Sequence, residues 1–151
     1  MSQSLSTVYI HLIFHIKTTS VAIQEDDQSG LNAYVAGTLN NIECPAIAVG
    51  GVRDHLHLLF RLSPKETLAG VVERVKVASH RYLESIDRMY HRFSWQTGYG
   101  AFSVSPNILE TAKQYVLHQK EHHRDKDFSK EYLTFLRGYK VNFNEEYVFK
   151  D

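Results

Sequence analysis

The order in which two hydrophobic periods follow each other is the feature that most limits what this chain can fold into. Apolar side chains at every second position are typical of a β-strand with one buried face, whereas three- and four-residue spacing is typical of a helix. The patterns run in the order strand, helix, strand, strand, helix, strand. The six segments are 8–16, 31–42, 46–52, 55–62, a helix from Ser63 or Thr67 to about Tyr90, and 101–104.

Two more helices are predicted after the last strand. Asn107, with Glu110 three residues later, can cap the first of them, which extends to about Arg124. The second begins at Ser129 and stops at Gly138. Two split βαβ units with extra helices predict an α+β, ferredoxin-like fold. In it, an antiparallel sheet carries helices on one face, and an extra C-terminal helix bears a tyrosine, Tyr115.

Length and composition narrow the function classes. The 151 residues suit a single domain spanning 1–151. Seventeen basic and seventeen acidic residues give zero formal charge, so any contact with nucleic acid must be local. Cys44 is the only cysteine, which excludes an internal disulfide and a cysteine zinc knuckle. The apolar runs are too short to span a bilayer and the N-terminus is unlike a signal peptide, so a cytoplasmic protein with no membrane partner is expected.

His55 and His57 form the sharpest local signal. Side chains alternate along a strand, so both imidazoles point to one face while Leu56, Leu58 and Phe60 point to the other. Two adjacent imidazoles can bind one divalent ion, with the second nitrogen of each ring held by another group. The alternative is a hydrogen-bonded pair of histidines on a half-buried strand, because a His-x-His pattern alone is common.

A second signal lies in the helix predicted over 107–124. At about 100° per residue, Gln119 and His122 fall close to Tyr115, so one face presents a phenol, an amide and an imidazole. Tyr115 borders the apolar stripe of this helix, where a tyrosine can keep its hydroxyl free. The alternative is a tyrosine at the edge of the core beside solvated histidines.

A stripe of arginines follows one side of the long helix expected between about 63 and 90. Such a stripe can track a phosphate backbone in spite of zero net charge, although a solvated helix face has the same spacing. The arginines are Arg74, Arg81, Arg88 and Arg92.

Three blocks of sequence carry a family resemblance. They are 51–59 (GVRDHLHLL), 95–105 (WQTGYGAFSVS) and 115–123 followed by Phe128, with 8–17 and 146–148 extending the pattern over nearly the whole chain. In their order and spacing they resemble the HUH single-tyrosine transposases of bacterial insertion sequences, the IS200-like family.

The resemblance implies a DNA transposase that cleaves and rejoins single-stranded DNA at the ends of an insertion sequence. It implies that His55, His57 and Gln119 hold Mg²⁺ or Mn²⁺, and that Tyr115 is the nucleophile of a 5′-phosphotyrosine intermediate. Two further histidines near the tyrosine are candidates for contacts behind the ligands: His118 and His122. The implied partners are single-stranded DNA with hairpin ends and a second copy of the chain. In such a homodimer the histidines of one subunit meet the tyrosine helix of the other.

Two other functions remain open at this point. A metal-dependent hydrolase could use the His-x-His pair with further ligands and an activated water in place of the tyrosine. A non-catalytic, ferredoxin-like regulator that binds nucleic acid would keep the arginine stripe and tolerate the loss of either histidine. The ferredoxin-like fold hosts many activities and does not choose among them.

Overall fold

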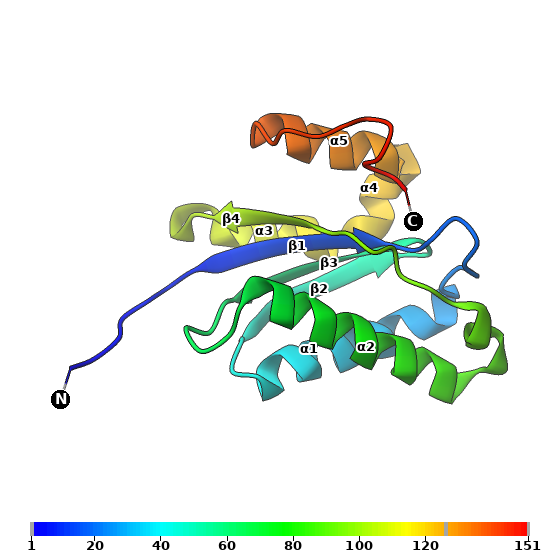
Figure 1. The fold of residues 1–151 in the computed structure, drawn as a ribbon, viewed down its shortest axis with the longest axis horizontal. Coiled ribbons are helices and arrows are strands. Elements are labelled where there is room, and N and C mark those ends of the chain that lie inside the picture. Colours follow the sequence, from blue (N-terminus) through cyan, green and yellow to red (C-terminus); the bar gives the residue numbers. More distant parts are fainter. Residues whose placement is uncertain (1, 126, 151) are drawn as a thin grey trace.

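The computed structural model describes residues 2–125 and 127–150 and contains a four-stranded antiparallel sheet in the order β2-β3-β1-β4. The strands are β1 (Tyr9–His15), β2 (Ala46–Val52), β3 (His55–Arg61) and β4 (Gly100–Val104). Helices α1 (Glu25–Asn41) and α2 (Leu68–Ile86) cover one face, and α3 (Leu109–Leu117), α4 (Gln119–Asp125) and α5 (Phe128–Gly138) lie on the other (Figure 1). Short 3₁₀ turns occupy Arg88–Arg92 and Pro106–Ile108. The α+β, ferredoxin-like prediction is confirmed.

The larger core lies between the sheet and the first two helices. One set of alternating strand residues points into it, including Leu12, Phe14 and Leu58. Leu31, Val35 and Leu39 of α1 meet them at the helical spacing read from the sequence. Because this core is apolar, it stabilises the sheet without specifying any chemistry.

The second face of the sheet is also buried, unlike the one-faced strand expected over 8–16. Residues 10–15 of β1 are all buried, because the C-terminal helices pack on this face through two smaller apolar clusters. Val116 of α3 packs on Leu59 and Val104, while Tyr132 of α5 packs near Phe102. Both faces of the strands are therefore inside the protein.

Three helix boundaries differ from the sequence prediction. The first helix begins at Glu25 rather than Leu31, because three acidic residues in its first turn suit the positive end of the helix dipole although they break the apolar pattern. The long helix begins at Leu68, where the Thr67 hydroxyl accepts a hydrogen bond from Gly70 N at 3.0 Å, and it ends at Ile86 rather than near Tyr90. The helix predicted over 107–124 is two helices, α3 and α4, with a break at residue 118.

Candidate active site

Strand β3 places two histidines side by side on the face covered by α3, α4 and α5, as the alternation predicted. His55 and His57 are both fully buried there. The Nδ1 atom of each ring has a hydrogen-bond partner: Asp54 Oδ1 lies 2.7 Å from His55 Nδ1, and His11 Nε2 lies 2.7 Å from His57 Nδ1. Both Nε2 atoms consequently turn toward the same space, the orientation that histidine ligands of a metal adopt.

Two residues from the C-terminal helices complete this group. His123 of α4 and Glu131 of α5 each offer a ligand atom, and together with His55 and His57 the four atoms lie within 4.8 Å of one another. Gln119 is buried beside them, and its Oε1 lies 3.3 Å from His55 Nε2 and 3.1 Å from His123 Nε2. Imidazole nitrogens with carboxylate and amide oxygens form a donor set that suits divalent ions. The cluster can hold a metal ion.

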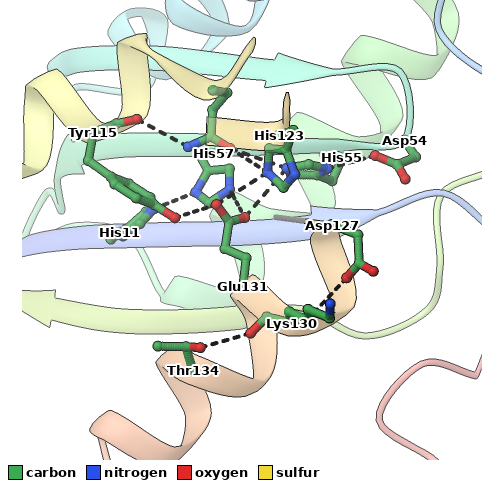
Figure 2. Close-up of polar contacts among 11 residues, drawn as sticks. His11, Asp54, His55, His57, Tyr115, His123, Asp127, Lys130, Glu131 and Thr134 are labelled. Atoms are coloured by element: carbon green, nitrogen blue, oxygen red, sulfur yellow. Dashed lines mark hydrogen bonds and ion pairs between the residues drawn. The ribbon is translucent and has the colours of Figure 1, made fainter. Parts of the chain in front are cut away.

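The carboxylate of Glu131 is the electrostatic centre of the cluster. Its Oε1 accepts a hydrogen bond from His57 Nε2 at 2.8 Å, and its Oε2 lies 3.2 Å from His123 Nε2 (Figure 2). Burial opposes the charge on Glu131, but the hydrogen bonds from His123, His57 and Tyr115 outweigh burial and hold the pKa of this carboxyl well below its ordinary value. Burial also lowers the pKa of His57 to about 4, in spite of the adjacent carboxylate. The cluster thus pairs a charged carboxylate with a neutral His57.

Tyr115 reaches the same cluster from α3. Its hydroxyl donates a hydrogen bond to Glu131 Oε2, and its ring lies 5.8 Å from the ring of His57 (Figure 2). Burial and the hydrogen bond to Glu131 raise the pKa of Tyr115 well above its ordinary value. Tyr115 as a residue is half-buried, at the edge of the cluster. The structure therefore brings together the predicted residues Tyr115, Gln119, His55 and His57.

A glycine in β2 allows α3 to lie this close to the sheet. A Cβ atom added at Gly50 would stand 2.0 Å from the backbone carbonyl oxygen of Val116, the residue after the tyrosine. Only glycine leaves room for that carbonyl. A residue outside the cluster therefore sets how closely α3, which carries Tyr115, approaches β2.

The two histidines expected behind the ligands have different surroundings. His118 stands at the end of α3, where its Nδ1 donates to the carbonyl of Gln114 at 2.7 Å. His122 stacks on the Tyr115 ring, with centroids 4.5 Å apart, but is exposed. His122 thus lies beside Tyr115, as the helical spacing predicted. The helix is interrupted at His118, and the histidine of α4 that joins the cluster is His123.

The four arginines of the predicted stripe do not border the cluster. Arg74 and Arg81 are exposed on α2, which lies on the opposite face of the sheet (Figure 1). Arg88 and Arg92 belong to the 3₁₀ turn after that helix, so the stripe does not continue along one helix. A role for Arg74, Arg81, Arg88 and Arg92 in DNA binding remains a prediction, and it concerns a surface away from the tyrosine.

His123 and Glu131 were missed because no short-range pattern marks them. Glu131 lies 74 residues from His57 and 16 from Tyr115 along the chain, and only the packing of α5 brings it inward. The sequence offers one indirect signal for Glu131, which lies beside Tyr132 on the apolar side of an amphipathic helix. Burial of a glutamate there is energetically unfavourable unless the carboxylate is paired, so its position indicates a buried partner.

The sequence profile of the family described as "Transposase IS200 like" matches residues 4–119. The chain belongs to the IS200-like transposase family. The match includes β1 to β4 and ends at Gln119, so His123, Glu131 and the tail at 146–148 lie beyond it. Membership places this chain in a family of enzymes that move DNA. A search of curated proteins finds no match.

Two solved structures resemble this transposase in fold. One is a crystal structure assigned as a transposase from Deinococcus radiodurans R1, with a TM-score of 0.60 and 20% identity, covering 77% of this chain and 95% of that one. The other is a REP-associated tyrosine transposase bound to a REP hairpin, with a TM-score of 0.53 and 9% identity, covering 77% and 70%. At these identities the likeness concerns the fold alone. Within the described residues of this transposase, no helix has the length and apolar character needed to cross a membrane.

Proposed function

We propose that this transposase cleaves and rejoins single-stranded DNA through a covalent 5′-phosphotyrosine on Tyr115, with Mg²⁺ or Mn²⁺ at the histidine cluster. One observation carries the proposal. In a chain of this family, the Tyr115 hydroxyl reaches the cluster that contains His55, His57 and Gln119. A metal-dependent hydrolase would use an activated water and would not need a tyrosine hydroxyl at this cluster.

His55, His57 and Gln119 would hold the ion, with His123 as a further donor. Their Nε2 and Oε1 atoms converge, and Asp54 and His11 fix the two strand imidazoles from behind. When bound, a divalent ion supplies positive charge that polarises a phosphate oxygen and orients the scissile group. The ligands come from β3 and α4, so docking of α4 on the sheet and ion binding support each other.

Tyr115 would supply the nucleophilic oxygen. Its phenolic oxygen forms a bond to phosphorus, the bond from phosphorus to the 3′ oxygen breaks, and the phenolic proton leaves as the 3′ oxygen gains one. The products are a 5′-phosphotyrosine and a free 3′-hydroxyl. Because one phosphoester replaces another, a second 3′-hydroxyl can reverse the step and join DNA without ATP.

The surface beside the cluster supports a path for single-stranded DNA over the β2–β3 turn. Arg53 is exposed on this turn and lines two hollows of about 430 and 420 Å³. Lys120 lines the first hollow, where it is paired with Glu25, and Lys17 lines the second together with Asp54, the partner of His55. We propose that Lys17, Arg53 and Lys120 contact the phosphates on either side of the bond that is cleaved.

Hairpin DNA and a homodimer are the proposed partners. The structural neighbour bound to a REP hairpin supports DNA hairpins as ligands for this fold. The family resemblance supports pairing of two copies. The arginines of α2 and the following turn, far from the tyrosine, would then hold duplex DNA rather than the strand being cut.

Labelled single-stranded DNA from the flanks of the encoding gene tests this function. Incubated with Mn²⁺ or Mg²⁺, the protein should yield a band on a denaturing gel that carries both label and protein. EDTA should remove the band, and Tyr115→Phe should remove it while DNA binding persists. An adduct formed by Tyr115→Phe, or cleavage that leaves no covalent protein, would contradict the proposal and favour a hydrolase.

A further inference from the structure

We propose that the carboxylate of Glu131 occupies the place that the scissile phosphate takes in the reaction, so that DNA must displace it before Tyr115 can attack. This inference rests on the proposed function. It makes α5 an internal inhibitor, a helix that closes the site with an anion of the protein itself.

The reaction sets where the phosphate has to lie. Its phosphorus must come within about 3–3.5 Å of the Tyr115 oxygen, while another of its oxygens faces the ion at the strand histidines. Glu131 lies between the same two groups (Figure 2). Its Oε2 accepts the hydrogen bond from the Tyr115 hydroxyl, and its Oε1 accepts from His57 Nε2 at 2.8 Å and lies 3.5 Å from His55 Nε2. A phosphate placed for attack would overlap this carboxylate.

The groups around Glu131 suit a phosphate equally well. A carboxylate and a phosphodiester are both singly charged anions with two oxygens that accept hydrogen bonds. Tyr115, His57 and His123 face Glu131, with His123 Nε2 at 3.2 Å from Oε2. Two anions held this close together would repel each other, so the cluster accepts one of them at a time.

Glu131 also competes with the ion for His57. The Nε2 atom of His57 donates to the carboxylate, and a nitrogen that carries a proton has no lone pair for a metal. Departure of Glu131 therefore frees a ligand atom and the phosphate position in one step.

Helix α5 is attached so that Glu131 can leave without disturbing the main core. Its buried residues Phe128, Tyr132 and Leu136 pack with Ile13 and Phe102 in a cluster separate from the one under α1 and α2. The family profile ends at residue 119, before this helix begins. Segments that rest on few apolar contacts are the ones that open first.

Removal of the charge on Glu131 tests the displacement. Glu131→Gln keeps the shape of the side chain but is neutral, and it should bind labelled single-stranded DNA from the flanks of the encoding gene about tenfold more tightly than wild type. Apparent affinity falls with the fraction of molecules whose site is open, and a fraction of about 10% gives this factor. Fluorescence anisotropy in EDTA measures binding without cleavage.

Glu121→Gln is the matched control, because it removes the same charge from an exposed carboxylate on α4. Its affinity for DNA should stay within about twofold of wild type, since a single exposed charge acts weakly through solvent. Equal affinities of the Glu131→Gln and Glu121→Gln proteins would overturn the inference. Thermal melting verifies that both are folded, and Glu131→Ala replaces Glu131→Gln if that variant is not.

Binding of Mn²⁺ without DNA separates displacement from a role of Glu131 as a ligand of the ion. Displacement predicts that Glu131→Gln binds Mn²⁺ at least as tightly as wild type in calorimetry, because His57 is released. A loss of about tenfold or more in Mn²⁺ affinity would show that the carboxylate holds the ion, and would overturn the inference.

The adduct rate gives a third measurement. With saturating Mn²⁺ and DNA well below its Kd, Glu131→Gln should form adduct about tenfold faster than wild type, in step with its tighter binding. A rate at or below that of wild type would contradict displacement. Failure of wild type to form any adduct would refute the proposed function instead, because the DNA and Mn²⁺ affinities do not depend on cleavage.

Discussion

The two faces of the sheet are built from the same strands and serve opposite purposes. On the face toward α1 and α2, residues such as Leu12, Leu58 and Phe60 form an apolar core. On the face toward α3, α4 and α5, the alternate positions carry His11 and His57 among smaller apolar clusters. Both faces are buried, but only one is polar.

The difference shows how a small fold separates stability from chemistry. Apolar burial on the first face stabilises the sheet in proportion to its area and depends little on exact geometry. Polar burial on the second face is unfavourable unless each group has its partner, and here the histidines, Gln119 and Glu131 supply partners to one another. Substitutions on the two faces should therefore have separable effects on stability and on reaction.

The largest expected effect comes from His57→Gln on the polar face. Glutamine keeps an amide that can donate to Glu131 but removes an imidazole ligand. Adduct formation should fall about 100-fold or more, because the ion stabilises charge at the phosphate by several kcal/mol. The rate is measured by denaturing gel with Mn²⁺, alongside the melting temperature. A rate near that of wild type would mean that His57 holds no ion needed for the reaction.

Leu58→Ala tests the apolar face of the same strand, because Leu58 directly follows His57 and points to the opposite side of the sheet. Leu58 is fully buried in the apolar core, so its truncation should cost about 2–5 kcal/mol of the free energy of unfolding. Urea denaturation measures the loss. The adduct rate per folded molecule should stay at the wild-type level. A rate that fell as far as in His57→Gln would show that the two faces are not separable.

Gly50→Ala perturbs the close contact between β2 and α3, the helix that carries Tyr115. The new Cβ would meet the Val116 carbonyl, so we expect a loss of about 1–3 kcal/mol from overpacking and a slower adduct reaction as α3 moves. Gly37→Ala is the control, since a Cβ there meets nothing within 4 Å and the position lies within α1. That control should gain about 0.5–1 kcal/mol, because alanine favours helix over glycine. Equal stability of the two variants in urea would refute the close-approach argument.

The smallest expected effect is on the salt dependence of DNA binding, compared between two arginines on opposite faces of the sheet. For single-stranded DNA without a hairpin, Arg53→Ala should lower the slope of log affinity against log salt by about 0.7, the value for one phosphate contact. Arg81→Ala on α2 should leave that slope unchanged. Fluorescence anisotropy over a salt series measures both. A larger change in Arg81→Ala would place the cleaved strand on the face opposite the tyrosine.

Much of the fold and part of the site could be predicted from local patterns. The alternation in β3 correctly placed His55 and His57 on one face, and helical spacing correctly placed Gln119 near Tyr115. The same spacing also placed His122 beside Tyr115, where the two rings stack with centroids 4.5 Å apart, but it did not indicate His123, because it assumed a continuous helix through His118. Local patterns are dependable only while the backbone keeps one period.

By itself, the sequence determined the strands and helices, their ferredoxin-like order and the pairing of two imidazoles on one strand face, because each of these follows from periodicity among neighbouring residues. Only the tertiary structure decided that His123 and Glu131 join them, that Asp54 and His11 support them, and that Tyr115 meets Glu131. These contacts depend on how α4 and α5 pack over the sheet. Such packing is set by shape and burial across distant segments, which no period along the chain records.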